Sequence, residues 1–284
     1  MSSVLVAGGS GGLGAFLVKA LSESPKFSTV KILARPDNSH KAAKAAPARV
    51  EIVRAEYTDH AGLLKALHGV DIVISALNGI AAGDPQIALI KAAKEANVKK
   101  FVPTEFGVDP SRQASFSFYA DKLKAQQALR DASLAYTLYG TGLFPDTDLA
   151  AWFGFDIENN KITLVGDGNQ PISWTLREDV ARFVVDTVLE ESSNNKVVNI
   201  EGDVKTANEV VALLEKKKGV KFDVIRKDPD QALAEAKATG NPGIVAVTEI
   251  QVGYATGFAK VSNPSELSFK PKSVEAWVNE NVRA

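Results

Sequence analysis

Apolar residues in the first half of the chain gather in short runs that alternate with longer amphipathic stretches. The apolar runs occupy residues 4–7, 29–34, 50–54, 71–75 and 99–103. The stretches with helical periodicity occupy residues 13–21, 39–46, 61–67 and 85–96. Strands that alternate with helices of this length are typical of βαβ units, in which helices cover both faces of a parallel sheet. The pattern therefore predicts an α/β fold with a Rossmann-type, doubly wound parallel sheet.

The second half of the chain has a less regular pattern. It predicts strands at residues 135–140 and 162–165. It predicts helices at residues 116–133, 175–189, 206–217 and 229–238. We expect a dinucleotide-binding domain over residues 1–150, to whose sheet later segments add, and a smaller C-terminal α/β substrate-binding region over residues 151–284.

Charge and composition exclude several classes of protein. The 284 residues carry 33 Lys and Arg against 34 Asp and Glu, whereas proteins that bind nucleic acid by neutralising phosphates have a basic excess. The chain has no cysteine, which excludes disulfides and thiol chemistry, and its three histidines do not have the spacing of metal ligands. We expect a cytoplasmic protein with no metal, no nucleic-acid partner and no membrane segment.

A glycine-rich loop lies between the first predicted strand and the first predicted helix. Gly8, Gly11 and Gly14 form the pattern G-x-x-G-x-x-G. In such a loop the first glycine allows a tight turn, the second lets a pyrophosphate approach the backbone, and the third lets the helix pack closely on the strand. A ligand-free turn is the alternative, but the strand and helix on either side favour a dinucleotide site. The predicted cofactor loop also contains Ser10, Gly12 and Leu13.

Arg35 ends the second predicted strand, where a site for NAD usually has an acidic residue that binds the ribose 2′-hydroxyl. A guanidinium instead suits a 2′-phosphate, by its charge and by its bidentate geometry. Lys44 would add a second positive charge. We therefore predict NADPH as the cofactor, the alternative for Arg35 being an ordinary surface arginine.

Lys122 lies on the helix predicted after the fifth strand. A typical short-chain dehydrogenase has a tyrosine four residues before its active-site lysine, and here that position is Phe118. Tyr119, three residues before the lysine, lies on a similar helix face, but we expect it to pack rather than to act as an acid. By spacing alone Lys122 has three open roles: an exposed helix lysine, a ligand of the cofactor ribose, or a catalytic group.

Taken together, these motifs resemble the isoflavone reductase and phenylcoumaran benzylic ether reductase group, within the NmrA-like atypical short-chain dehydrogenases. The residues that carry the resemblance are the glycine loop at 8–14, Arg35 with Lys44, the segments 68–76 and 103–107, and Lys122. The resemblance implies hydride transfer from NADPH to a small aromatic or conjugated substrate. It also implies that Lys122 serves as general acid/base without a tyrosine.

The resemblance further implies which residues contact the cofactor and the substrate. Ala76, at the end of the fourth strand, and Glu56, where the group commonly has an acid in a Gly-Asp-Leu pattern, are expected to bind the cofactor, as is Lys122. The residues expected to line an aromatic substrate pocket are Phe106, Phe144, Trp152 and Phe153. Plain packing in the core is the alternative for most of these aromatic side chains.

Two further functions stay open. NmrA-like regulators bind dinucleotides and a protein partner without catalysis, and the glycine loop and Arg35 serve such a redox sensor equally well. A non-redox isomerase or dehydratase that holds the cofactor only structurally is the third hypothesis. Lys122 and the segment 104–107 favour the reductase, for which a homodimer is a further option.

Overall fold

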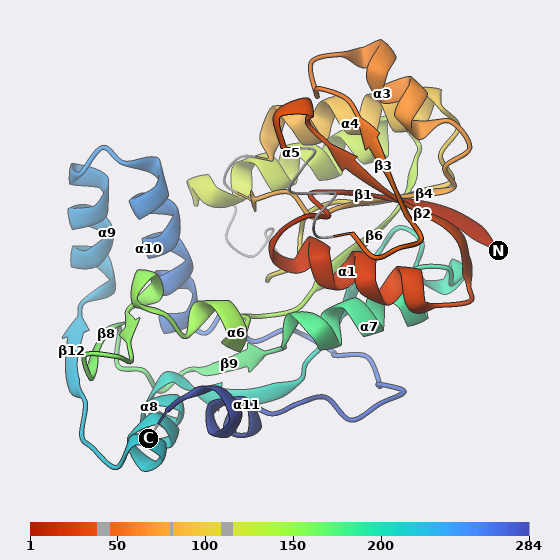
Figure 1. Ribbon diagram of the computed structural model, residues 1–284. Helices are drawn as coiled ribbons and strands as arrows, with labels where there is room; N and C mark the ends of the chain where they lie inside the picture. Colours follow the sequence, from red (N-terminus) through yellow and green to blue (C-terminus); the bar gives the residue numbers. More distant parts are fainter. Residues whose placement is uncertain (39–45, 80–81, 109–115, 284) are drawn as a thin grey trace. The chain divides into compact units, whose positions relative to one another are not determined.

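The computed structural model describes residues 1–38, 46–79, 82–108 and 116–283 (Figure 1). Its contacts divide the chain into two units of three segments each. The first unit comprises Met1–Glu105, Ala120–Tyr139 and Val180–Val198. The second unit comprises Phe106–Tyr119, Gly140–Asp179 and Asn199–Ala284.

The sequence pattern predicts a boundary near residue 150, with later segments adding to the sheet of the first domain. Strands of that sheet do come from distant parts of the chain. The last strand of the sheet in the first unit, β10, is Lys196–Asn199, far beyond residue 150. A single cut in the sequence therefore separates strands that are hydrogen-bonded neighbours.

The first unit is built on a seven-stranded sheet with the order β10-β6-β5-β4-β1-β2-β3. Its other strands are β1 (Ser2–Ala7), β2 (Phe27–Ala34), β3 (Val50–Arg54), β4 (Ile72–Ser75), β5 (Lys100–Val102) and β6 (Ala135–Gly140). The pairings from β3 through to β6 are parallel. The strand order reverses between β1 and β4, and ligands of doubly wound sheets bind at such a point, outside the carboxyl ends of the strands.

Helices cover both faces of this sheet. Figure 1 shows α3, α4 and α5 on one face and α1 and α7 on the other. Their bounds are α1 Gly12–Glu23, α3 His60–Leu67, α4 Gly83–Glu95, α5 Ser117–Asp131 and α7 Arg177–Thr187. Leu63, Leu89 and Leu129, one from each of α3, α4 and α5, share a core with Val73 and Phe101 of the sheet. Burial on both sides explains why the strands are almost continuously apolar.

The strands and helices predicted in the first unit are confirmed, with ends within two residues of those expected. The same holds for β8 (Lys161–Val165), α8 (Ala207–Lys218) and α9 (Pro229–Ala238) in the second unit. The helix predicted at 39–46 falls on residues 39–45, outside the described part of the chain. Among the described residues, no helix combines the length and the apolar character that a membrane crossing requires.

The second unit contains two small sheets and the later helices. One sheet has the order β12-β8-β7 and the other pairs β11 with β9. The bounds are β7 Phe155–Asp156, β9 Pro171–Trp174, β11 Asp203–Thr206 and β12 Asp223–Lys227. The helices are α6 (Pro145–Asp148), α8, α9, α10 (Pro242–Ala255) and α11 (Val274–Asn281). Trp174 is the largest fully buried side chain of its core.

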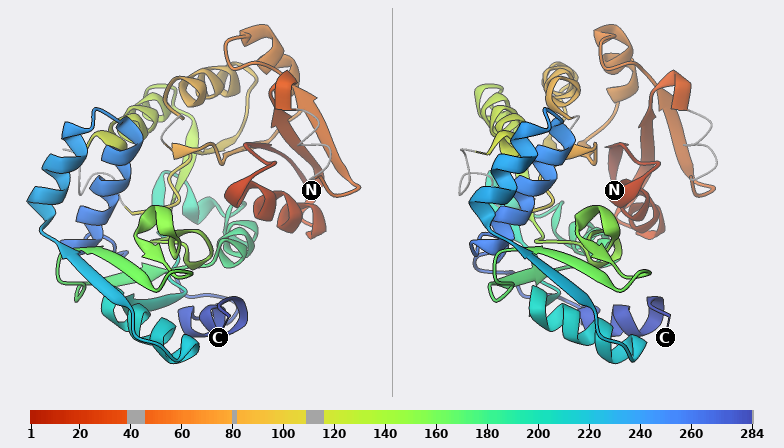
Figure 2. Two further views of the ribbon diagram at one scale, coloured as in Figure 1. Left: turned by 60° about the vertical axis from the view of Figure 1, so that its left-hand side comes forward. Right: turned by 90° about the vertical axis from the view of Figure 1, so that its left-hand side faces the viewer.

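Helices α10 and α11 are not predicted by the sequence pattern. Figure 2 shows α10 beside α9. The buried residues of α10 include Ala246, Glu249 and Tyr254. Apolar residues are spread around α10, so it has no single apolar stripe of the kind from which helices are recognised in a sequence. The other helix, α11, has eight residues, which is too short for a periodic pattern to stand out.

Candidate functional site

Two positions of the glycine loop accept only glycine. Gly8 has φ +77°, and a Cβ added there would lie 2.5 Å from the carbonyl oxygen of Ala76. A Cβ on Gly14 would collide with the carbonyl oxygen of Gly8. The first contact brings the end of β1 against the segment after β4, and the second packs α1 onto the loop. These are the two roles that the spacing predicts for the outer glycines.

The middle of the loop is open. Gly11 and Gly12 are exposed, and a Cβ on either would have no described heavy atom within 4 Å. Gly11 is the N-cap of α1 and has no side chain to cap the helix, and the first turn, which includes Leu13, has no acidic residue. Backbone N–H groups and the positive end of the helix dipole are therefore available to an anion.

A cavity of about 280 Å³ lies beside this loop. It is formed by the ends of β1 and β2 and by the segment after β4. Its lining residues are Gly8, Ser10, Leu33, Ala34, Arg35, Tyr57, Leu77, Asn78 and Pro85. The structure therefore brings Ser10 and Arg35, which are distant in sequence, to one cavity at the carboxyl ends of the strands. Ala76 does not line this cavity, and its N–H donates to the carbonyl of Ala7 at 2.8 Å.

The side chain of Arg35 is half exposed, with 51% of its surface accessible. Its Nε lies 3.7 Å from Oδ1 of Asp37, which is a long contact between two exposed groups. Such pairs contribute little, so the guanidinium stays available to a ligand anion. Lys44, predicted as the second positive charge, lies outside the described residues.

Tyr57, rather than Glu56, faces the cavity. Glu56 is exposed and is not among the lining residues, whereas Tyr57 lines the cavity next to Arg35. Burial raises the pKa of the Tyr57 hydroxyl to about 12, against the opposing effect of the Arg35 charge. The phenol therefore stays neutral and offers a flat ring and a hydrogen-bond donor. The sequence did not identify Tyr57, because the resemblance pointed to the acidic residue beside it, Glu56.

Hydrogen bonds fix the ends of β4 and β5 to each other. Oγ1 of Thr104 donates to the carbonyl of Leu77 at 2.7 Å, and the Thr104 N–H donates to Oε1 of Gln86 at 2.8 Å. Gln86, on α4, is buried. These bonds hold the cavity wall at Leu77 to the segment that leads to Glu105. Nothing in the sequence pattern identified Gln86, because a lone glutamine on a helix carries no periodic signal.

Lys122 is buried in the first unit, with 5% of its surface exposed. Its Nζ donates to the backbone carbonyl of Glu105, which follows the end of β5. Burial lowers the pKa of the Lys122 amine, and the negative charge of Glu105 opposes this effect. The first of the three open roles, an exposed helix lysine, is therefore wrong.

Glu105 is itself held in place from α5. Its side chain accepts a hydrogen bond from Nε2 of Gln126 at 3.1 Å, and both residues are buried. Gln126 lies one turn after Lys122 on the same helix. Helix α5 therefore donates two hydrogen bonds to Glu105, one to the backbone carbonyl of Glu105 and one to its carboxylate.

The N-terminus of α5 is capped from α10, within the second unit. Glu249 accepts hydrogen bonds from the N–H of Ser117, the hydroxyl of Ser117 and the N–H of Phe118, each at 2.9 Å. Only 2% of Glu249 is exposed. A carboxylate here satisfies helix N–H groups and opposes the positive end of the dipole. Sequence reasoning missed Glu249 because the cap comes from a distant segment.

Tyr119 is buried, with 3% of its surface exposed. Its ring packs edge-on against that of Phe118, with the centroids 5.1 Å apart. This is the packing role that we expected for Tyr119.

The four aromatic residues expected to contact substrate have different environments within the second unit. Phe153 is 1% exposed and packs against Tyr254, with ring centroids 5.7 Å apart. Trp152 is 54% exposed and donates from its indole N–H to the carbonyl of Thr147. Phe144 is half-buried, and Phe106 is buried with an unusual positive φ of +31°. Core packing, the alternative stated for these side chains, describes Phe153.

Three features now surround one doubly wound sheet. They are a glycine loop that accepts only glycine at two positions, an arginine at the end of β2, and a buried lysine on the helix that follows β5. The sequence profile of the NmrA-like family matches residues 1–277. The chain belongs to the NmrA-like family. The resemblance to isoflavone reductases and phenylcoumaran benzylic ether reductases is confirmed, because proteins with these names match most of the chain.

Two of these relatives come from plants. An isoflavone reductase homologue, P3, from Arabidopsis thaliana is 30% identical over 292 residues, covering 97% of this chain and 93% of the relative. A phenylcoumaran benzylic ether reductase, TP7, from Nicotiana tabacum is 30% identical over 255 residues, covering 85% of this chain and 82% of the relative.

Solved structures confirm the fold. AtPrR2 with NADP+ and (+)pinoresinol superposes with a TM-score of 0.83 at 25% identity, over 99% of both chains. The binary complex of leucoanthocyanidin reductase and NADPH from Vitis vinifera superposes with a TM-score of 0.80 at 23% identity, over 98% of both chains. The predicted Rossmann-type fold of this NmrA-like chain is therefore confirmed.

Proposed function

We propose that this protein is an NADPH-dependent reductase of a small aromatic or conjugated molecule, with Lys122 as the general acid/base. The observation that carries the proposal is the burial of Lys122 beside the end of β5, in the unit that also holds the glycine loop. A fully buried lysine is rare in a purely structural role unless it is paired. Relatives named as reductases, one of them solved with NADP+, support the same class of reaction.

The described residues fit a phosphorylated dinucleotide. The open backbone at Gly11 and Gly12 would hold the pyrophosphate at the N-terminus of α1. Arg35 would bind the 2′-phosphate, and Tyr57 would lie against the adenosine end in the same cavity. At about 280 Å³ the cavity is slightly smaller than the usual range for whole ligands, as expected if it takes only one end of the cofactor.

The bound cofactor supplies the hydride, and this chain supplies the proton. Burial favours the neutral amine of Lys122, so its ammonium form gives up a proton more readily than an exposed lysine would. The carbonyl of Glu105 orients Nζ, because it accepts a hydrogen bond from the amine. We expect turnover to fall as the pH rises through the lowered pKa of Lys122, since the proton donor is then lost.

The nature of the substrate rests on the relatives. AtPrR2 was solved with pinoresinol, an aromatic molecule, and the plant relatives are named for aromatic substrates. We propose an aromatic or conjugated acceptor for this chain on that basis. Phe106, Phe144 and Trp152 are proposed to contact it, together with Phe153 through the packing of its neighbours.

The test compares Lys122→Ala with Lys124→Ala, an exposed lysine two residues later that pairs with Asp121. A panel of quinones, conjugated carbonyl compounds and benzylic ethers is screened with the wild-type protein, and NADPH and NADH binding is titrated by fluorescence. We expect tighter binding of NADPH than of NADH. Lys122→Ala is expected to lower kcat by about 10²-fold or more, whereas Lys124→Ala leaves it unchanged.

Two outcomes contradict the proposal. Unchanged turnover in Lys122→Ala would remove the lysine from the chemistry. Tight NADPH binding without turnover of any compound, and with no effect of the substitution, would favour a redox sensor of the NmrA-like type.

A further inference from the structure

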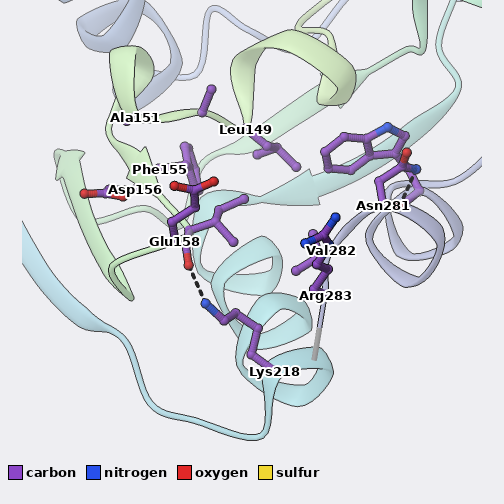
Figure 3. Close-up of a pocket in the computed structure, with 12 residues that line it drawn as sticks. Leu149, Ala151, Phe155, Asp156, Glu158, Lys218, Asn281, Val282 and Arg283 are labelled. Atoms are coloured by element: carbon purple, nitrogen blue, oxygen red, sulfur yellow. Dashed lines mark hydrogen bonds between the residues drawn. The ribbon is translucent and has the colours of Figure 1, made fainter.

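A second and larger cavity lies within the second unit. Its volume is about 670 Å³, inside the usual range for sites that bind small molecules. Figure 3 shows that its walls come from the segment around β7, from the end of α8 and from the residues that follow α11. None of its lining residues is shared with the cavity beside the glycine loop.

Part of the lining of this cavity is apolar and fixed in shape. Leu149, Phe155 and Val282 line it, and each is less than 10% exposed and belongs to the core of the unit. Trp277 also lines it, half-buried against the same core. Side chains held by a core keep their positions, so this surface is preformed for a flat apolar body.

Two of the four charged lining residues are already used within the protein. Lys218 donates to the carbonyl of Ile157 at 2.6 Å. Asp156 accepts hydrogen bonds from the side chain and the backbone of Asn159. These contacts stabilise the hairpin and the end of α8.

The other two charged lining residues are Glu158 and Arg283. Within the described part of the chain, neither Glu158 nor Arg283 makes a side-chain hydrogen bond or ion pair. Figure 3 places them on different walls, Glu158 with the hairpin of β7 and Arg283 with the residues after α11. The cavity therefore offers a hydrogen-bond acceptor at one side and a planar cationic donor at the other, with apolar side chains between them.

We propose that this cavity is a second ligand site, which binds a small aromatic carboxylic acid that carries a hydroxyl group on its ring. The carboxylate would pair with the Arg283 guanidinium, whose fork matches it in charge and geometry. The hydroxyl would donate to the Glu158 carboxylate, and the ring would lie against Phe155 and Trp277. A rigid ring suits the site, because it loses little conformational freedom on binding.

The test is isothermal titration calorimetry of the full chain with 4-hydroxycinnamate. Cinnamate, which lacks the hydroxyl, and 4-hydroxycinnamyl alcohol, which lacks the carboxylate, serve as comparison compounds. We expect Arg283→Gln to weaken 4-hydroxycinnamate binding about tenfold and to leave binding of the alcohol unchanged. Glu158→Gln is expected to weaken 4-hydroxycinnamate binding about threefold and to leave cinnamate binding unchanged.

Controls separate this site from other places where the probe could bind. Arg54→Gln removes an exposed arginine of β3 in the first unit and should leave all three affinities unchanged. Ala151→Trp, at a lining position, should abolish binding by filling the cavity while the protein stays folded by circular dichroism. Lys122→Ala should bind the probe normally, so this site and the proposed reductase site fail or succeed separately.

The proposal is overturned if 4-hydroxycinnamate does not bind at millimolar concentration. It is also overturned if the probe binds with an affinity that neither Arg283→Gln nor Ala151→Trp changes, because binding then occurs elsewhere. Equal weakening of the acid and the alcohol by Arg283→Gln would contradict the assigned carboxylate contact.

Discussion

The two units bury different charges. The first unit buries two lysines, Lys100 and Lys122, with the carboxyl group of Glu105, whereas the second unit buries the carboxyl groups of Asp148 and Glu249. In the second unit both acids accept backbone N–H groups near the start of a helix, α6 for Asp148 and α5 for Glu249. Carboxylates there serve as caps, because helix N-termini have unpaired donors.

The two buried lysines of the first unit, Lys100 and Lys122, differ in the contacts of their amines. Nζ of Lys100 donates to the carbonyls of Val188 and Glu190, at 2.8 and 3.0 Å, and to Oγ of Ser193 at 3.0 Å. All three hydrogens of its ammonium are used, and they hold the chain beyond α7 against β5. Lys122, on α5, donates to the carbonyl of Glu105, which lies beyond the other end of that strand. The two buried lysines therefore differ in what they hold: Lys100 fixes the segment beyond α7, and Lys122 contacts the residue that closely follows β5.

The largest effect on stability is expected for Lys100→Ala. The change leaves the buried carbonyl of Val188 and the carbonyl of Glu190 without their donor and opens a gap beside β5, so the free energy of unfolding should fall by about 3 kcal/mol. Urea denaturation measures this. Lys99→Ala is the matched control, since Lys99 is 77% exposed and its pair with Asp71 is a surface ion pair worth less than about 1 kcal/mol. Equal losses for the two variants would contradict the assigned role of Lys100.

A smaller effect is expected for Glu249→Ala, about 2 kcal/mol, because three donors at the start of α5 lose their acceptor. Hydrogen exchange gives a local measurement, in which the amides of Ser117 and Phe118 should exchange faster than in the wild type. Glu235→Ala, an exposed acid of α9, should change stability by less than about 0.5 kcal/mol. Unchanged exchange at Phe118 would show that the cap is not stabilising.

The smallest effect is expected for Asp148→Asn, and it depends on pH. Burial raises the pKa of Asp148 to about 6, against the hydrogen bonds from Phe144 and Thr147. The folded protein therefore holds this proton up to about pH 6, whereas the unfolded chain releases it near pH 4. Because the folded state binds more protons in this window, stability falls as the pH rises from 4 to 6, by about 2 kcal/mol at most.

The neutral amide of Asp148→Asn should remove that slope and raise stability at pH 7 by about 1 kcal/mol. Thermal unfolding between pH 4 and pH 7 measures both effects. Asp230→Asn, at an exposed position, should keep the slope of the wild type. If the stability of the wild type, compared with that of Asp148→Asn, rose from pH 4 to pH 6, the raised pKa assigned to Asp148 would be wrong.

The chain sequence predicted the first unit well and the second unit less well. Strands β1 to β6 and the helices around them follow local rules, because a strand buried on both faces must be apolar along its length. In the second unit, α10 carries apolar residues on all sides and β7 has only two residues, so neither gives a readable period. The glycine loop was predictable for the same local reason: its spacing encodes contacts between residues that are close in sequence.

The candidate site divides in the same way. Gly8, Gly14, Arg35 and Lys122 could be named from the sequence because each occupies a fixed place relative to a strand end. Tyr57, Gln86 and Glu249 could not, because each acquires its role from a partner more than fifteen residues away.

The sequence by itself therefore determined the order of strands and helices, the glycine loop and the position of the lysine. Only the tertiary structure decided that Lys122 is buried, that Lys100 is saturated with acceptors, that Tyr57 rather than Glu56 faces the cavity, and that Glu158 and Arg283 line one cavity. The physical reason is the distance along the chain over which each effect acts. Backbone propensity and hydrophobic period act over a few residues, whereas burial and the pairing of charges depend on segments that meet only when the chain has folded.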